Sequence, residues 1–293
     1  MTGPILLFGA NGQLGRELCA LAALRGENVI GLTRAEADIA DAMAVEAAIA
    51  NAKPRLIVNA AAYTAVDKAE GDIEGATRGN VLGPAVLARG ANAAGVPLMH
   101  VSTDYVFDGT KAGAYVENDP ISPLGVYGRT KAEGERAVRD AAKRHVIVRT
   151  SWVYGVHGAN FLKTMLRLAK ERDELRIVAD QRGCPTSTRD LAEAILTIDA
   201  AIAGGATPWG TFHFAGSGAT TWHGFASEII AAQGRITGRR PTVTPIATSD
   251  FPTPARRPAN SELDSSLFAK TFGYVARPWQ ERTAQTVAEL LSP

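Results

Sequence analysis

A glycine-rich segment near the amino terminus constrains the fold most strongly, because it directly follows a short apolar run. The run is Ile5–Phe8, and the glycines that follow it at intervals of three residues are Gly9, Gly12 and Gly15. Glycines let a chain turn sharply from a strand into a helix and approach a pyrophosphate, which the free N–H groups of the helix can bind. The segment therefore predicts a dinucleotide-binding turn. Its spacing, G-x-x-G-x-x-G, differs from the more common G-x-G-x-x-G, so a tight turn without a ligand stays an alternative.

Five short apolar runs predict the strands of a parallel sheet. They are continuous rather than alternating, as strands covered by helices on both faces are. Amphipathic stretches between them predict helices at Gln13–Leu24, Asp41–Asn51 and Val81–Ala94, and a fourth helix that Ser122 caps and that runs to about Ala142. This alternation predicts an α/β fold with a Rossmann-type, doubly wound parallel sheet. The predicted strands are Ile5–Phe8, Val29–Leu32, Leu56–Asn59, Leu98–Ser102 and Val146–Thr150.

The regular alternation ends near Thr150, and the rest of the chain predicts a smaller, less regular unit. One stretch, Thr237–Asn260, is rich in residues that favour loops, and such stretches often shape or cover a binding site. We therefore expect a dinucleotide-binding domain over residues 1–151 and a mainly substrate-binding domain over 152–293, with some later segments returning to the first. The later elements that we expect are helices at Phe161–Glu171, Thr188–Ala203, Phe225–Gln233 and Glu281–Leu291 and a strand at Thr211–Ala215.

The composition favours a small-molecule partner. The net charge is +1, from 31 basic and 30 acidic residues, so there is no strong field to attract nucleic acid or a membrane surface. No apolar run approaches the ~20 residues that a membrane helix needs. The two cysteines, Cys19 and Cys184, indicate no disulfide framework and favour a reducing compartment. We expect a cytoplasmic protein.

A tyrosine and a lysine four residues apart predict a proton-transfer site. Tyr127 and Lys131 fall on one face of a predicted helix. A nearby ammonium favours the phenolate, so the pKa of the tyrosine, ordinarily about 10, should fall toward the working range. Thr103, at the end of the fourth predicted strand, is placed to polarise a substrate carbonyl. Together the three side chains indicate carbonyl reduction, although two surface residues on any helix can show the same spacing.

The end of the second predicted strand bears on the choice of cofactor. An acid there would accept hydrogen bonds from the adenosine ribose, but this chain has Arg34, whose guanidinium can pair with a 2′-phosphate. The sequence therefore favours NADPH over NADH, with an ordinary exposed arginine as the alternative. Small residues after the third strand, Ala60–Ala62, leave room for a cofactor, and Asp38 with Ile39 could flank its adenine.

Five longer segments carry a family resemblance over nearly the whole chain: Asn59–Glu70, Ser102–Gly109, Thr150–Tyr154, Asp180–Thr186 and Pro252–Ser261. They resemble the extended short-chain dehydrogenase/reductases and, within them, the dTDP-4-dehydrorhamnose reductase family. The resemblance implies NAD(P)H-dependent reduction of the C4 keto group of a dTDP-4-keto-6-deoxy sugar. Its product would be dTDP-L-rhamnose, a precursor of cell-surface polysaccharide.

The resemblance also implies a role for each matching residue. Tyr127 is similar to the family's general acid and Lys131 to its partner, while Thr103, Asp104 and Trp152 are similar to residues that contact the sugar. Basic side chains in the last segment, Arg256 and Arg257, are our candidates for the substrate diphosphate, with an ordinary basic loop as the alternative. The residues that we expect at the cofactor are Gly9, Asn11, Gly12, Gln13, Leu14, Gly15, Arg34, Asp38, Ile39, Ala61, Ala62, Tyr63, Tyr127 and Lys131.

The resemblance leaves metal binding and assembly open. Some members of the family are magnesium-linked dimers held by glutamates, which Glu17 and Glu289 match, but Arg189 stands where an acid is expected. We therefore expect no metal, Mg²⁺ being doubtful, and a monomer or weak homodimer. The alternative functions are a nucleotide-sugar epimerase or dehydratase of the same superfamily, a non-catalytic regulatory subunit, and a nucleotide-binding sensor.

Overall fold

A six-stranded parallel sheet forms the centre of the larger half of the molecule. In this computed structural model, which describes residues 3–292, the strand order is β10-β5-β4-β3-β1-β2, and every neighbouring pair is parallel. The order reverses between β1 and β3, and ligands of such sheets bind at the carboxyl ends of the strands flanking the reversal. The strands are β1 (Ile5–Phe8), β2 (Val29–Leu32), β3 (Leu56–Asn59), β4 (Leu98–Thr103), β5 (His145–Thr150) and β10 (Gly210–His213).

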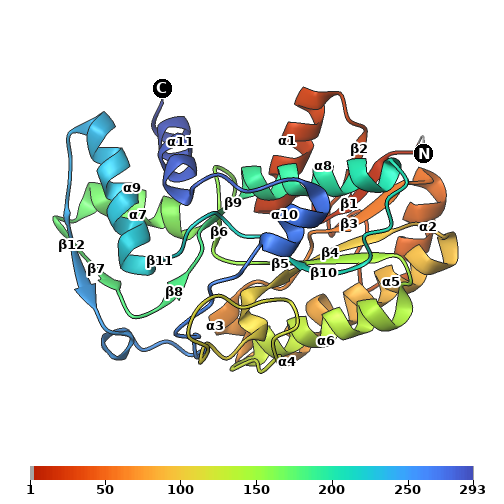
Figure 1. Cartoon of the computed structure of the whole chain (residues 1–293), viewed down its shortest axis with the longest axis horizontal. Coiled ribbons are helices and arrows are strands. Elements are labelled where there is room, and N and C mark those ends of the chain that lie inside the picture. Colours follow the sequence, from red (N-terminus) through yellow and green to blue (C-terminus); the bar gives the residue numbers. More distant parts are fainter. Residues whose placement is uncertain (1–2, 293) are drawn as a thin grey trace.

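Helices cover both faces of this sheet (Figure 1), as its uninterrupted apolar strands require. On one face, Ile5 and Leu7 of β1 pack with α1 (Gln13–Arg25) and α8 (Thr188–Ala203). On the other face, Leu6 and Phe8 pack with three helices. These helices are α2 (Ala42–Ala52), α5 (Gly83–Ala94) and α6 (Val126–Ala141).

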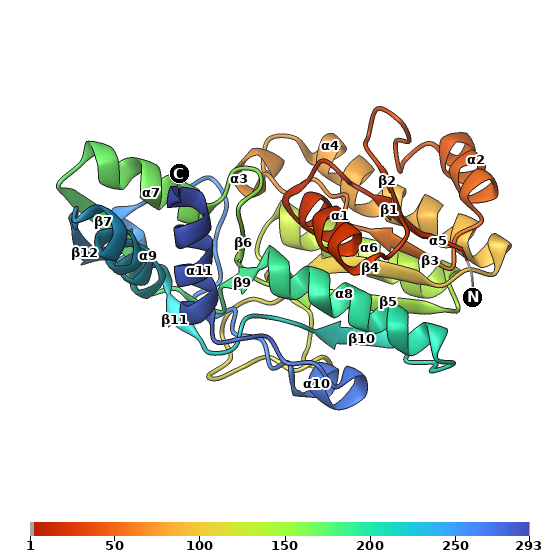
Figure 2. The ribbon, with the colours of Figure 1, turned by 90° about the horizontal axis from the view of Figure 1, so that it is seen from above.

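The smaller half has its own apolar core beside the carboxyl edge of the sheet (Figure 2). Its helices are α7 (Phe161–Glu171), α9 (Trp222–Thr237) and α11 (Trp279–Leu291), which pack together through Leu162, Phe225 and Val287 among others. Paired short strands complete it: β7 (Glu174–Val178) with β12 (Thr242–Ile246), β6 (Val153–Tyr154) with β9 (Thr186–Ser187), and β8 (Arg182–Gly183) with β11 (Thr220–Thr221).

Short helical segments connect these elements. They are α3 (Val66–Ala69), α4 (Ile73–Thr77), the π-helical η1 (Arg78–Leu82), the 3₁₀ turns η2 (Asp104–Val106) and η3 (Thr248–Asp250), and α10 (Ser266–Phe272). Among residues 3–292, no helix combines the length and the apolar character that crossing a bilayer requires.

Most predicted elements occur where the sequence indicates them, but α9 extends beyond the predicted Phe225–Gln233 at both ends, and α6 starts later than predicted. We expected Ser122 to cap this helix, but the structure places the N-cap at Gly125. No side chain caps the helix locally. Instead the carboxylate of Glu70 accepts a hydrogen bond from the Val126 amide at 2.9 Å. The helix start is therefore set by a residue 56 positions earlier in the chain, which no local pattern reveals.

Two segments that follow residue 152 lie in the larger half. Strand β10 pairs with β5 at the edge of the main sheet, and α8 packs against α1. The two halves are therefore not two consecutive stretches of chain. Residues 1 and 2, at the start of the first predicted domain, and residue 293, at the end of the second, lie outside the described residues.

Candidate active site

A cavity of about 820 Å³ lies at the carboxyl edge of the sheet and reaches the smaller half. Its walls come from the β1–α1 turn, the ends of β3 and β4, the first turns of α6, and the segments around β6, α7 and α9. Most of the predicted site residues therefore meet in one place. Those that line the cavity are Gly9, Asn11, Gly12, Gln13, Leu14, Arg34, Ala61, Ala62, Thr103, Asp104, Tyr127, Lys131 and Trp152.

The glycine turn fits an anionic ligand. Gly9 has φ +91°, which disfavours any other residue, and a Cβ on Gly15 would collide with the Gly9 carbonyl oxygen. Gly12 is the N-cap of α1, where no side chain caps the helix and no acid occupies the first turn. The first N–H groups of α1 thus have no side-chain partner at the cavity wall. Such a helix start suits a pyrophosphate.

Four residues predicted at the cofactor lie outside the cavity lining: Gly15, Asp38, Ile39 and Tyr63. Ile39 is buried in the core, where its side chain fills the space above Gly83. The hydroxyl of Tyr63 donates to Asp72 at 3.0 Å. Asp38 is engaged by two arginines, Arg34 and Arg78. The structure does not bring these four to the cavity as it brings the others.

Arg34 reaches the rim of the cavity at the end of β2. Its side chain is 80% exposed and lies 3.5 Å from the Asp38 carboxylate. Arg78 holds the same carboxylate at 2.9 Å. Burial acts to raise the pKa of Asp38, but the hydrogen bond from the Ala40 amide and the charge of Arg78 together keep this pKa below its ordinary value. Asp38 is therefore not a free acid facing the cofactor position. The sequence analysis did not single out Arg78, because only the tertiary structure brings it beside Asp38.

Tyr127 and Lys131 lie on one face of α6 inside the cavity. Burial raises the pKa of Tyr127 to about 12, and contact with Thr103 opposes this rise. Lys131 is buried and donates from Nζ to the Val101 carbonyl at 2.6 Å. Burial lowers the pKa of Lys131 to about 8. The expectation of a lowered tyrosine pKa was therefore wrong, because desolvation of the phenolate, together with the nearby Asp104 carboxylate, raises the pKa.

A buried ion pair fixes α6 against the sheet behind these residues. Arg149 of β5 donates from Nε and Nη2 to the two carboxylate oxygens of Glu135, both at 2.8 Å. Ser102 donates to the same carboxylate at 2.6 Å. Because Ser102 precedes Thr103 and Glu135 follows Lys131 by one helical turn, this network sets the distance between the two sides of the site.

Two stacked indoles close the end of the cavity in the smaller half. Trp152, in the left-handed region at φ 47°, stacks on Trp222 with ring centroids 3.7 Å apart. The N-cap of α7, Asn160, reaches Gln13 of the glycine turn at 2.9 Å. Trp222 and Asn160 were not singled out in the sequence, although each lies at a recognisable helix start. They link the smaller half to the cavity.

The two arginines predicted for the diphosphate lie outside the cavity lining. Arg257 makes a two-pronged ion pair with Asp67, at 3.1 and 2.8 Å, and also bonds Thr253 and the Ala255 carbonyl. Arg256 is exposed. Arg257 thus clamps the loop after η3 to α3, and its guanidinium is already neutralised.

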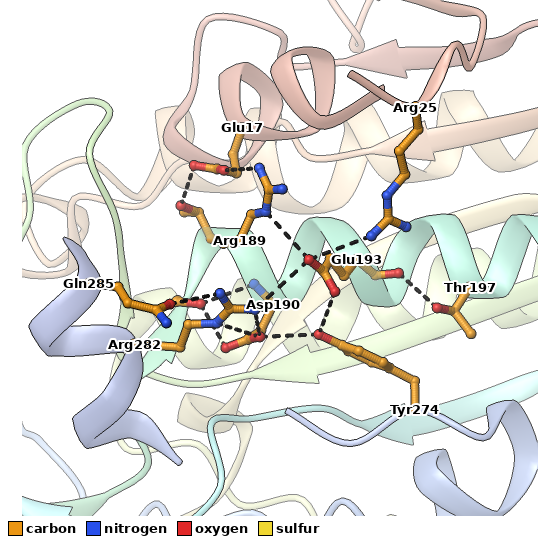
Figure 3. Close-up of polar contacts among 11 residues, drawn as sticks. Glu17, Arg25, Arg189, Asp190, Glu193, Thr197, Tyr274, Arg282 and Gln285 are labelled. Atoms are coloured by element: carbon orange, nitrogen blue, oxygen red, sulfur yellow. Dashed lines mark hydrogen bonds and ion pairs between the residues drawn. The ribbon is translucent and has the colours of Figure 1, made fainter. Parts of the chain in front are cut away.

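The acidic residues matched to a magnesium site do not fit a metal. A second cavity, of about 240 Å³, contains Glu17 and Glu289, but Arg189 lies with them. Its guanidinium is 3.6 Å from the Glu17 carboxylate and 3.4 Å from Glu193 (Figure 3). Among residues 3–292, no group of three or more potential ligands is arranged to hold a metal ion. A fixed guanidinium thus occupies the position where a cation would balance Glu17.

The fold and the cavity together define the class of the protein. A doubly wound parallel sheet, a glycine turn at the first strand and a Tyr-Lys pair on one helix face of the same cavity are the features of a short-chain dehydrogenase/reductase.

Comparison with known proteins specifies the family. The family model described as RmlD substrate binding domain matches residues 1–292. A dTDP-4-dehydrorhamnose reductase of Sinorhizobium fredii is 46% identical over 289 residues, which cover 98% of this chain and 97% of the relative. The chain therefore belongs to the dTDP-4-dehydrorhamnose reductase family.

Solved structures agree in fold over the whole length. A dTDP-4-dehydrorhamnose reductase of Clostridium acetobutylicum is 41% identical with a TM-score of 0.91, and the match covers 98% of this chain and 99% of that one. A dTDP-4-dehydrorhamnose reductase of Bacillus anthracis, solved in complex with NADP, is 33% identical with a TM-score of 0.91, over 99% of this chain and 100% of that one.

Proposed function

We propose that this protein reduces the C4 keto group of dTDP-4-dehydro-L-rhamnose to give dTDP-L-rhamnose, with NADPH or NADH as the reductant. The observation that carries the proposal is the meeting of Thr103, Tyr127 and Lys131 in the cavity that the glycine turn also lines. Family membership supports the choice of substrate. The redox partner is a nicotinamide because the same cavity offers a pyrophosphate-binding helix start.

The cofactor is held by the larger half. The α1 amides after Gly12 bind its pyrophosphate, and Arg34 pairs with a 2′-phosphate where the cofactor is NADPH. The bound nicotinamide supplies the hydride. Lys131, held by the Val101 carbonyl, is placed to hydrogen-bond a cofactor hydroxyl and to keep its position relative to Tyr127. We propose that the larger half of the molecule, which includes β10 and α8, is the cofactor-binding half.

Tyr127 supplies the proton to the forming alkoxide. Its raised pKa, about 12, keeps the phenol protonated at neutral pH, which is the form that reduction needs. An acid with a pKa of about 12 donates its proton favourably only to a stronger base, and an alkoxide is one. The water-poor environment also strengthens the hydrogen bond to the substrate oxygen.

The substrate lies toward the smaller half. Trp152 and Trp222 form an apolar wall against which a sugar ring packs. We propose Arg256 for the diphosphate, and Arg257 only if the substrate displaces Asp67. We also propose that the protein is a cytoplasmic monomer or weak homodimer, a location consistent with its unpaired cysteines, Cys19 and Cys184.

The test is an assay with the 4-keto sugar nucleotide and each cofactor. We expect continuous, stoichiometric loss of reduced nicotinamide, whereas an epimerase or dehydratase regenerates its cofactor in each turnover and a sensor or regulatory subunit binds without turnover. Tyr127→Phe should keep cofactor binding and lose more than nine-tenths of kcat, roughly 1.4 kcal/mol or more in the barrier. Tyr274→Phe, which removes a phenol that bonds Asp190 and lies outside the cavity lining, is the matched control.

A further inference from the structure

One hydrogen bond joins the starts of two helices that belong to opposite halves of the molecule. The side-chain nitrogen of Asn160, the N-cap of α7, donates to Oε1 of Gln13, the first residue of α1, at 2.9 Å. Gly158 has φ +66°, and a Cβ there would lie 2.8 Å from Gln13 Cγ. All three residues line the cavity in which we propose that the cofactor binds. The segment before α7 therefore packs directly on the glycine turn.

The hydrogen bonds of Asn160 decide which end of the Gln13 amide is left for a ligand. Asn160 Oδ1 accepts from the Lys163 amide at 3.0 Å, and Nδ2 also donates to the Gly155 carbonyl at 2.8 Å. Because a carbonyl only accepts and an amide N–H only donates, these two bonds fix the orientation of the Asn160 side chain. Asn160 therefore presents its NH₂ group to Gln13, which accepts with its oxygen. The NH₂ group of Gln13, at the start of α1, is the end left to donate to a pyrophosphate oxygen.

The residue after Asn160 contacts the aromatic wall at the sugar end of the cavity. The ring of Phe161 packs against Trp222, with centroids 4.7 Å apart, and Trp222 stacks on Trp152 at 3.7 Å. Phe161 also stacks on Phe225 of α9, with centroids 5.5 Å apart. Asn160 at the glycine turn and Phe161 at the wall are consecutive residues, so a shift of one displaces the other.

We propose that Asn160 couples the cofactor site to the sugar site, so that each ligand raises the affinity of the protein for the other. The inference rests on the proposed reductase function and makes Asn160 a positioning residue. On one side it orients the amide of Gln13, and on the other it acts on the sugar through Phe161 and Trp222. The cofactor site then includes a segment of the smaller half.

Both ligands gain from the ordering of the same helix start. A pyrophosphate bound at α1 fixes the Gln13 amide, and this amide holds Asn160 through their hydrogen bond. A sugar packed against Trp222 fixes the same start of α7 through Phe161. The ligand that binds first loses the entropy of ordering this start, and the second ligand then binds more tightly. The effect is reciprocal, because it is a difference in binding free energy between the two sites.

The experiment measures the binding of one ligand in the absence and in the presence of the other. NADPH and dTDP-L-rhamnose, the proposed product, suit this purpose because both are reduced and no hydride can pass between them. The coupling ratio is the Kd for dTDP-L-rhamnose without NADPH divided by the Kd at saturating NADPH, both from titration calorimetry of the full chain. We expect a ratio of at least about five in the parent and below about two in Asn160→Ser. Serine keeps the cap of α7 but has no amide to donate to Gln13.

A second variant removes the same hydrogen bond from the other side. Gln13→Ala should lower the coupling ratio as far as Asn160→Ser does, and it decides the test if Asn160→Ser does not fold. Because both changes remove one bond, the double variant should lose no more coupling than either single variant. Asn92→Ser is the matched control. Asn92 accepts from the Lys143 amide at 3.4 Å and lies outside the cavity lining, so this variant should keep the parent's ratio.

The outcomes separate the coupling from the proposed function. A parent that fails to bind NADPH or dTDP-L-rhamnose would refute the proposed function. A parent that binds both ligands without coupling would overturn the inference alone, as would a ratio that stays unchanged in Asn160→Ser and Gln13→Ala. Weaker binding of both ligands to Asn160→Ser at the parent's ratio would show that Asn160 only supports the fold.

Discussion

The indole of Trp152 stacks on the indole of Trp222, with ring centroids 3.7 Å and planes 9° apart. Trp152 follows the main sheet and has a left-handed backbone, while Trp222 begins α9 in the smaller half. The ring of Phe161 also packs against Trp222, with ring centroids 4.7 Å apart and an angle of 50° between the planes. The stack thus joins the two halves at the wall where we propose that the sugar binds.

Loss of this stack should weaken substrate binding. We expect Trp222→Ala to raise KM for the sugar nucleotide about 3- to 10-fold, ~1 kcal/mol of aromatic contact, with little change in the KM for cofactor. Stacked indoles also give an exciton couplet, two circular-dichroism bands of opposite sign, which the variant should lose. Trp209→Phe, which removes an indole stacked against Arg144, is the control and should leave both the band and KM as they are. An unchanged KM in Trp222→Ala would remove Trp222 from the substrate wall.

The Glu135–Arg149 pair should dominate the stability of the region behind the active site. Both side chains are buried, at 0% and 2% exposure, so removing one leaves a charge in the core. We expect Arg149→Met to lower the free energy of unfolding by about 3–5 kcal/mol. Urea denaturation measures this loss. Arg139→Ala is the matched control. Arg139 is more exposed and lies 3.2 Å from the same carboxylate, so it should contribute less than about 1 kcal/mol to the free energy of unfolding.

The ionised form of Asp104 should lower the free energy of unfolding at neutral pH. Its pKa is about 6 in the folded protein and about 4 in the unfolded chain, so below pH ~4 both states are protonated and there is no cost. The cost grows as pH rises through 4 to 6 and is complete above that, at about 3 kcal/mol as an upper value. We therefore expect Asp104→Asn to be more stable than the parent at pH 7 and equal to it near pH 4. Urea midpoints over this range test it, and a constant difference would contradict it.

Arg34 should bias the enzyme toward NADPH. Its guanidinium is exposed at the rim of the cavity, where a 2′-phosphate would gain a charged hydrogen-bond partner. We expect Arg34→Ala to lower kcat/KM for NADPH about tenfold, ~1.4 kcal/mol, with a smaller change for NADH. Arg78→Ala, which also frees Asp38 but lies outside the cavity lining, is the comparison. An unchanged ratio of the two efficiencies in Arg34→Ala would remove this role.

Magnesium should not affect this protein. Because Arg189 already lies beside Glu17, we expect EDTA or added MgCl₂ to leave both the melting temperature and the sedimentation coefficient unchanged. Arg189→Glu removes the guanidinium and adds a carboxylate to the second cavity, so this variant should lose stability without metal and regain part of it with Mg²⁺. A metal-dependent shift in the parent would show that our assignment of this cluster is wrong.

Local patterns were sufficient for the parts of the fold that depend on neighbouring residues. The predicted bounds of α7 and α8 match the structure, because each has a polar N-cap side chain, Asn160 or Ser187, that accepts a bond from its first turn. The start of α6 was predicted wrongly because Glu70, distant in sequence, caps it. The glycine turn needs close approach of Gly9 and Gly15, which is itself local.

The sequence by itself determined the sheet, the glycine turn and the spacing of Tyr127 and Lys131, since periodicity and backbone sterics act over a few residues. Only the tertiary structure decided the electrostatics. Burial raised the pKa of Tyr127, Asp67 neutralised Arg257, and Arg189 took a position beside Glu17. Charge and solvation depend on which groups the folded chain brings within a few ångströms of one another, and residues far apart in the sequence supply most of those groups.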